Sequence, residues 1–150
     1  MKTATAIPAQ SSSAPSVETS RVPCIDHPTW AVGDCCHQGD LILVCIDPPK
    51  ALTRRKNRQL AEGETKGSRH VVVGGEVFDS NENEMVKNIA KVTNGRVTIL
   101  DPKYIGPVFY GPCVVEHPEH QHHGFPAGTF TAVVFQRNVD AEERERRAID

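Results

Sequence analysis

The sequence predicts a mostly β fold, either a small barrel or a compact β-sandwich. Short apolar runs recur along the chain, and turns that contain glycine or proline separate them at close intervals. This turn spacing predicts about six to eight short strands. A chain of 150 residues is long enough to bury one core without disulfides or metal ions, so we expect a single domain.

Composition divides the chain into three regions. Residues 1–28 contain a Ser-, Ala- and Pro-rich stretch and show no apolar periodicity, which predicts a disordered N-terminal arm. Residues 29–140 hold the apolar runs and are expected to form the single β domain. Residues 141–150 mix acidic and basic side chains, which predicts a charged C-terminal tail or a short helix.

The clearest strand is predicted at 41–46, where six apolar residues follow one another. An uninterrupted apolar run indicates a strand that is covered on both faces. The glycine pair at 74–75 and the Asn-Gly pair at 94–95 are typical of hairpin turns. Further strands are predicted at 71–73, 76–78, 96–100, 113–116 and 129–137.

Two segments give a weaker pattern. Residues 85–92 place apolar side chains on one helical face, but the β-type segments on either side favour a strand. Residues 104–112 are aromatic and contain two Gly-Pro pairs. Because proline cannot donate a hydrogen bond to a neighbouring strand, we expect an edge strand or a loop there.

Charge and apolar content exclude several classes of protein. The net charge of −2 argues against a surface dominated by nucleic-acid binding. The longest apolar run is far shorter than the roughly 20 residues that span a bilayer. The first residues lack the apolar segment of a secretory signal, so a cytoplasmic protein without membrane contact is expected. The five cysteines are an odd number without a paired spacing, which favours reduced thiols. They include no Cys-x-x-Cys pair, the usual spacing of a thiolate zinc knuckle.

The stretch 115–129 contains four of the seven histidines. Imidazole is the commonest protein ligand for transition metals, and residues two apart in an extended segment share a face. His70 lies between a polar turn and a predicted strand, from which it could join the stretch in space. A site of His70, His117 and His120 with Glu119 would have the ligand count of a catalytic zinc or a two-His-one-carboxylate iron centre.

Other interpretations of these residues stay open. Histidines gathered in a loop are often solvated or hydrogen-bonded and bind no metal. Cys113 precedes His117 by four residues, as in a nucleophilic Cys-His pair, although free cysteine in a strand is most often buried. Glu119 and His70 would suit acid-base hydrolysis if a cleft joined them.

A basic segment follows the strand at 41–46. Arg54, Arg55, Lys56 and Arg58 place four positive charges within five residues. A solvated loop is the commoner meaning of such a run, and phosphate or nucleic-acid binding is the alternative. The absence of interleaved aromatic residues argues against base stacking.

Several segments together resemble a family of small bacterial and phage proteins that have no assigned activity. The segments that carry the resemblance are 38–44, 60–70, 116–120, 126–129 and 136–137. The resemblance covers about residues 37–150 and implies one compact β domain. It also implies that His70 and the 117–120 segment belong to one pattern, but it supplies no catalytic residues.

The sequence favours a structural or binding module that associates with itself or with a protein partner, such as an oligomeric or phage-type accessory protein. The long arm and the lack of a complete catalytic motif support this interpretation and favour a protein that is not an enzyme. The first alternative is a metalloprotein of the histidine cluster, with zinc or iron and hydrolytic activity. The second is a nucleic-acid-associated protein that uses the basic segment.

Overall fold

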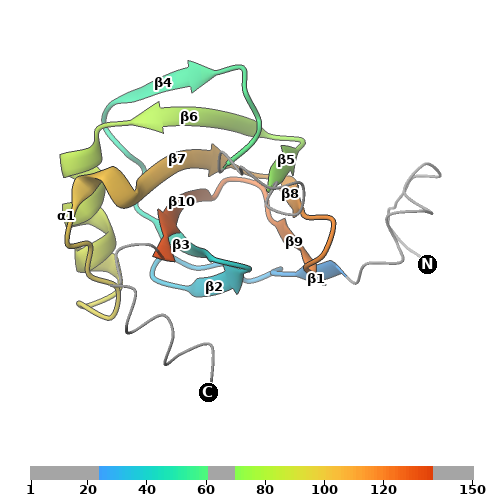
Figure 1. The fold of residues 1–150 in the computed structure, drawn as a ribbon, viewed down its shortest axis with the longest axis horizontal. Helices are drawn as coiled ribbons and strands as arrows, with labels where there is room; N and C mark the ends of the chain where they lie inside the picture. The colour runs from blue at the N-terminus through green and yellow to red at the C-terminus, as the bar shows by residue number, and fades with distance from the viewer. Residues whose placement is uncertain (1–23, 61–69, 137–150) are drawn as a thin grey trace.

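The computed structural model describes residues 24–60 and 70–136. Within them the chain forms two β-sheets and an α-helix, stacked in three layers (Figure 1). The strands are β1 (Cys24–Asp26), β2 (Cys35–Gln38), β3 (Leu41–Ile46), β4 (Leu52–Arg55), β5 (Val71–Val73), β6 (Glu76–Ser80), β7 (Ile105–Tyr110), β8 (Cys113–Glu116), β9 (His122–Phe125) and β10 (Phe130–Phe135). The helices are α1 (Glu82–Val92) and a 3-10 turn, η5 (Pro102–Tyr104).

The two sheets have four and six strands. The smaller sheet has the order β1-β9-β8-β5, and the larger has the order β2-β3-β10-β7-β6-β4. The β1–β9 pair is parallel, and the other strand pairs within the two sheets are antiparallel. Of the two predicted architectures, these residues form the β-sandwich.

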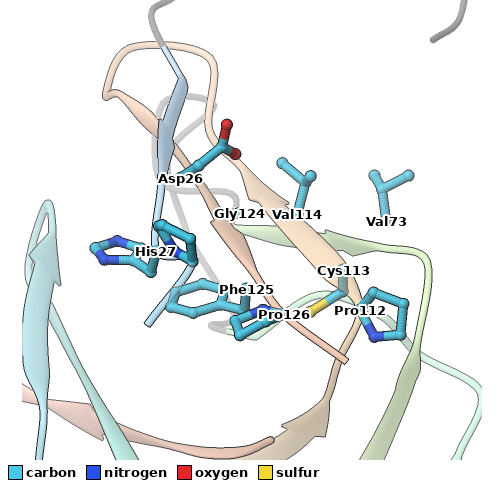
Figure 2. A pocket seen from close by; sticks show the side chains of 10 residues that line it. Asp26, His27, Val73, Pro112, Cys113, Val114, Gly124, Phe125 and Pro126 are labelled. Atoms are coloured by element: carbon cyan, nitrogen blue, oxygen red, sulfur yellow. The ribbon is translucent and has the colours of Figure 1, made fainter. Parts of the chain in front are cut away.

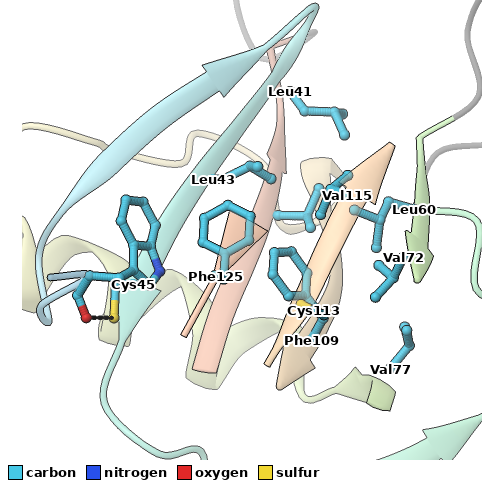
Figure 3. Packing of buried hydrophobic residues seen from close by; sticks show 12 residues of the cluster. Leu41, Leu43, Cys45, Leu60, Val72, Val77, Phe109, Cys113, Val115 and Phe125 are labelled. Carbon is cyan, nitrogen blue, oxygen red and sulfur yellow. Dashed lines mark hydrogen bonds between the residues drawn. The ribbon is translucent and has the colours of Figure 1, made fainter. Parts of the chain in front are cut away.

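The main core lies between the two sheets. Alternate residues of β3, among them Leu41 and Leu43, point into it and meet Val72 and Val115 of the smaller sheet. Phe109 is fully buried at its centre, with its ring centroid 5.2 Å from that of Phe125 (Figure 3). This burial of apolar side chains from both sheets holds the sandwich together.

A second core lies on the other face of the larger sheet. Val44 and Ile46 of β3 point toward α1, whose Met85 and Ile89 are fully buried. Both faces of β3 are therefore covered, as the uninterrupted apolar run predicts. None of the helices in residues 24–60 and 70–136 is long and apolar enough to cross a bilayer.

The strand predicted at 85–92 is wrong, because these residues belong to α1. Asn81 caps the helix: its side chain accepts a hydrogen bond from the backbone N–H of Glu84. Glu82 and Glu84 lie in the first turn and Lys91 in the last, where each complements the helix dipole. The helical periodicity of the apolar residues was thus the better guide than the β-type neighbours.

The region after α1 also differs from the predictions. Asn94 and Gly95 have positive φ, but they end the helix and do not form a hairpin, and 96–100 is irregular. The 104–112 segment supplies β7, an interior strand between β10 and β6. A register shift of β10 between Ala132 and Val134 lies opposite Pro107 and interrupts the ladder where proline has no N–H to donate.

Three residues of the region predicted to be a disordered arm form a strand. Cys24–Asp26, inside the 1–28 region, form β1 and pair with β9. The three residues are exposed, so no apolar pattern marked them as a strand. The rest of the arm and the predicted tail at 141–150 lie outside the described residues.

Replacement of Phe109 by Ala is expected to lower the free energy of unfolding by about 3–5 kcal/mol, because it opens a cavity where the sheets meet. Leu100→Ala is the control: this side chain is 78% exposed, and its loss should change stability by less than about 0.5 kcal/mol. Urea denaturation of the purified variants measures both effects. Equal midpoints for the two variants would contradict this account of the core.

Candidate metal centres

Three of the four ligands predicted from the sequence lie close together. The ring of His117 is 4.4 Å from that of His70 and 4.4 Å from that of His120, measured between centroids. His70 directly precedes β5, and the other two lie in the loop between β8 and β9. Together with Gln38 and Asp40, at the turn between β2 and β3, these residues are called the His70 cluster.

Gln38 orients His70. The Gln38 amide nitrogen donates hydrogen bonds to the backbone oxygens of Val115, at 2.9 Å, and Gln121, at 2.8 Å. Its amide oxygen is thereby directed at Nδ1 of His70, 2.8 Å away. Because an amide oxygen only accepts, Nδ1 of His70 must carry the proton, and Nε2 presents a lone pair when the ring is neutral.

His117 has the opposite tautomer. Its Nδ1 accepts hydrogen bonds from the backbone N–H groups of Glu119, at 3.0 Å, and His120, at 3.2 Å. In the neutral ring Nε2 therefore carries the proton. His117 thus holds the loop in a turn, and Glu119 contributes to that turn through its backbone.

Burial keeps His70 neutral near pH 7. Its side chain is 1% exposed, and this desolvation, together with the nearby His117, lowers the pKa of His70 to about 4. The Asp40 carboxylate partly offsets the shift, with Oδ1 3.6 Å from Nε2. At neutral pH this contact is therefore not an ion pair but two acceptor atoms that face each other.

A second group of ligands, called the His27 cluster, consists of His27, Cys36 and His123. One ligand atom from each lies within 4.8 Å of the other two. His27 follows β1, Cys36 belongs to β2, and His123 belongs to β9, so the cluster joins the two sheets at one end of the sandwich. Nε2 of His27 is 2.9 Å from Nδ1 of His123, which is hydrogen-bond distance.

The His27 cluster contacts aromatic side chains; His123 is buried, whereas His27 and Cys36 are partly exposed. The His27 ring lies 4.9 Å from that of Trp30 and 5.1 Å from that of Phe125. Burial lowers the pKa of His27 and lowers that of His123 to about 4. Burial also raises the pKa of the Cys36 thiol to about 12. In the absence of a bound ion, the cluster therefore consists of two neutral imidazoles and a protonated thiol.

Sequence reasoning missed the His27 cluster. His27 lies in the region that the sequence predicts to be a disordered arm, and Cys36 follows another cysteine without a metal-binding spacing. The only available signal was His123 within the histidine-rich stretch. The three residues meet because β1 pairs with β9 and because the larger sheet, which contains β2, packs against the smaller one, a placement that no local motif encodes.

An open groove of about 450 Å³ lies along the smaller sheet and is lined by residues of its four strands (Figure 2). Asp26, Gly124, Val114 and Val73 form one row across its four strands. Cys113 also lines the groove, and burial raises the pKa of its thiol to about 12. Cys113 and His117 are four strand positions apart, roughly 13 Å in an extended chain, so they do not form a nucleophilic pair.

The basic side chains of 54–58 mostly bind other parts of the protein. Arg54 pairs with Glu76 across β4 and β6, and Arg55 lies 3.1 Å from Asp79. Arg58 donates hydrogen bonds to the backbone oxygens of 72, 74 and 75. Lys56 is exposed. Three of the four positive charges therefore have partners within the protein, so their presence does not by itself indicate nucleic-acid binding.

The buried histidines predict a loss of stability in mild acid. The pKa of His70 is about 4 in the folded protein and about 6.5 when unfolded, so the unfolded chain binds more protons between these values. Its contribution is complete above pH 6.5 and falls by roughly 3 kcal/mol as the pH drops to about 4. His123 acts in the same direction.

Urea denaturation at several pH values, with a chelator present, measures this dependence. His70→Asn retains a donor toward Gln38 and cannot titrate, so its stability should change less steeply with pH than that of the unmodified protein. His37→Asn, at an exposed histidine, is the control and should retain the full slope. Equal slopes for all three proteins would show that His70 is not the titrating group.

Comparison with known proteins gives a family but no activity. No curated protein and no solved structure matches the chain. Residues 37–135 match the family described as Domain of unknown function (DUF8820). This match covers more than half of the sequence and contains the whole His70 cluster and His123, whereas His27 and Cys36 precede it. The chain therefore belongs to this family of domains of unknown function, DUF8820.

Proposed function

We propose that the protein is a zinc-binding β-sandwich module in which His27, Cys36 and His123 hold the ion. The observation that carries this proposal is the approach of one ligand atom from each residue to within 4.8 Å of the other two. Two imidazoles and a thiolate are typical zinc ligands, and zinc accepts such mixed nitrogen and sulfur sets.

The distances between the ligand atoms are close to those around a bound zinc ion. Around a tetrahedral zinc, two nitrogens lie about 3.3 Å apart, and a nitrogen and a sulfur about 3.6 Å apart. The His27 and His123 nitrogens are 2.9 Å apart. On binding, these nitrogens would separate by about 0.4 Å, and the Cys36 sulfur, within 4.8 Å of the other ligand atoms, would come to about 3.6 Å from them. Loss of the Cys36 proton supplies the thiolate.

The position of the cluster supports a structural role for the ion. His27 and His123 belong to the smaller sheet, and Cys36 belongs to the larger one. An ion held by all three would cross-link the sheets and fix β1, whose three residues are exposed and contribute little to the core. This proposal joins the structural-module and metalloprotein hypotheses. With three protein ligands, the fourth position is left to water or to another ligand.

Cobalt(II), which takes the place of zinc and reports on sulfur ligation, gives the test. The unmodified protein should bind cobalt and show a thiolate-to-cobalt charge-transfer band in the near ultraviolet. Cys36→Ser should abolish the band. It should also weaken zinc binding by more than the 10–100-fold typical for loss of an outer-shell partner.

The neighbouring cysteine provides a matched control. Cys35 faces the opposite side of β2 and packs against the helix-side core, so Cys35→Ser should retain the band and the zinc affinity. Competition with a chromophoric chelator measures the affinities, and elemental analysis gives the ratio of metal to protein. A charge-transfer band that survives Cys36→Ser, or no stoichiometric zinc in the unmodified protein, would refute the proposal.

A further inference from the structure

The His70 cluster has features of a second cation site that is separate from the His27 cluster. Its residues come from three places: the turn between β2 and β3, the residue before β5, and the loop between β8 and β9. It contains no cysteine. Its potential ligands are therefore imidazole nitrogens and carboxylate oxygens, the donors that manganese, iron, cobalt and nickel bind readily as divalent ions.

The first feature is a buried imidazole whose lone pair is fixed in direction. Gln38 is 2% exposed, and its amide is held by two backbone oxygens, so its own oxygen can only accept the proton of His70 Nδ1. Metal-binding histidines are oriented in this way, by a partner that binds the second ring nitrogen. This arrangement directs Nε2 of His70 toward Asp40.

The second feature is the carboxylate opposite that lone pair. Oδ1 of Asp40 lies 3.6 Å from Nε2 of His70, which is longer than the 2.7–3.2 Å of a hydrogen bond. Both atoms are acceptors when His70 is neutral, so a cation between them would stabilise the pair. Nitrogen and oxygen ligands of one ion lie about 2.9 Å apart in octahedral geometry and about 3.4 Å apart in tetrahedral geometry.

The third feature is the space above Gly39. A Cβ atom there would lie 3.0 Å from Nε2 of His120 and 3.3 Å from Cε1 of His70. The two rings therefore approach the same point, and any larger side chain would fill the space between them. The φ of +60° at Gly39 also favours glycine, because this turn needs the left-handed conformation.

We propose that Asp40, His70 and His120 form an open two-His-one-carboxylate site for a divalent transition-metal ion. His117 is a positioning residue, because its Nδ1 accepts hydrogen bonds from two backbone N–H groups of the loop that carries His120. The Asp40 side chain is 65% exposed and His120 is also exposed, which leaves the remaining coordination positions to water. Asp40 takes the carboxylate role that the sequence suggested for Glu119.

The site closes by a movement of one exposed side chain. Among the described residues, the His27 cluster is the group whose three ligand atoms already lie within 4.8 Å of one another. In the His70 cluster the His70 and Asp40 atoms are at nearly the required spacing, and rotation of the His120 side chain completes the set. His120 is exposed and lies outside both apolar cores, and its ring contacts that of His117.

Cobalt(II) titration of the full chain tests both sites at once. The unmodified protein should bind two ions, of which one gives the thiolate charge-transfer band. Cys36→Ser should bind one ion, without the band. The double variant Asp40→Asn/His120→Ala should also bind one ion, but with the full band. Both substituted side chains are exposed, so the denaturation midpoint of the double variant should match that of the unmodified protein.

The outcomes separate the two proposals. If the unmodified protein binds one cobalt with the band, or if the double variant still binds two, the Asp40 site is refuted and the His27 site stands. If the protein binds one cobalt without a band, and the double variant loses it, the reverse holds. His37→Ala is the control for a general effect of surface histidine, and it should leave binding at both sites unchanged.

Discussion

The hydrogen bonds of the buried Gln38 amide connect the two sheets to the histidine-rich loop. Gln38 belongs to β2 of the larger sheet, and its nitrogen donates to Val115 of β8 in the smaller sheet and to Gln121 in the loop before β9. An unpaired amide at this depth would be costly, so the three partners must all be in place when the sheets pack. The same bonds fix the tautomer of His70 and thereby the direction of its lone pair.

Both candidate centres combine residues of the larger sheet or its turns with residues of the smaller sheet or its loops. The core between the sheets is made by branched and aromatic side chains such as Leu43, Phe109 and Val133. At one margin histidine and cysteine take their place in the His27 cluster. The cluster is neutral without an ion because burial disfavours the charged imidazole and the thiolate. A bound cation would instead favour the thiolate form of Cys36, because its positive charge stabilises the negatively charged sulfur.

The two clusters differ in the ions that they suit. The His27 cluster offers sulfur and packs against Trp30 and Phe125, which fits a structural role for zinc. The His70 cluster offers a carboxylate and an exposed imidazole, which leave room for water or for a small molecule on the ion. The family match spans the His70 cluster entirely but includes only His123 of the His27 cluster. The two sites can therefore be tested, and can fail, independently.

The sequence alone determined the β class, the double coverage of β3 and the association of His70 with the loop at 117–120, because each follows from a local pattern or a resemblance. It did not determine α1 or the interior position of β7, since local signals there conflicted. The tertiary structure decided which side chains meet at the sites. Asp40 lies beside His70, and His27 lies beside Cys36 and His123, because strand pairing and the packing of two sheets bring together residues that are distant in the chain.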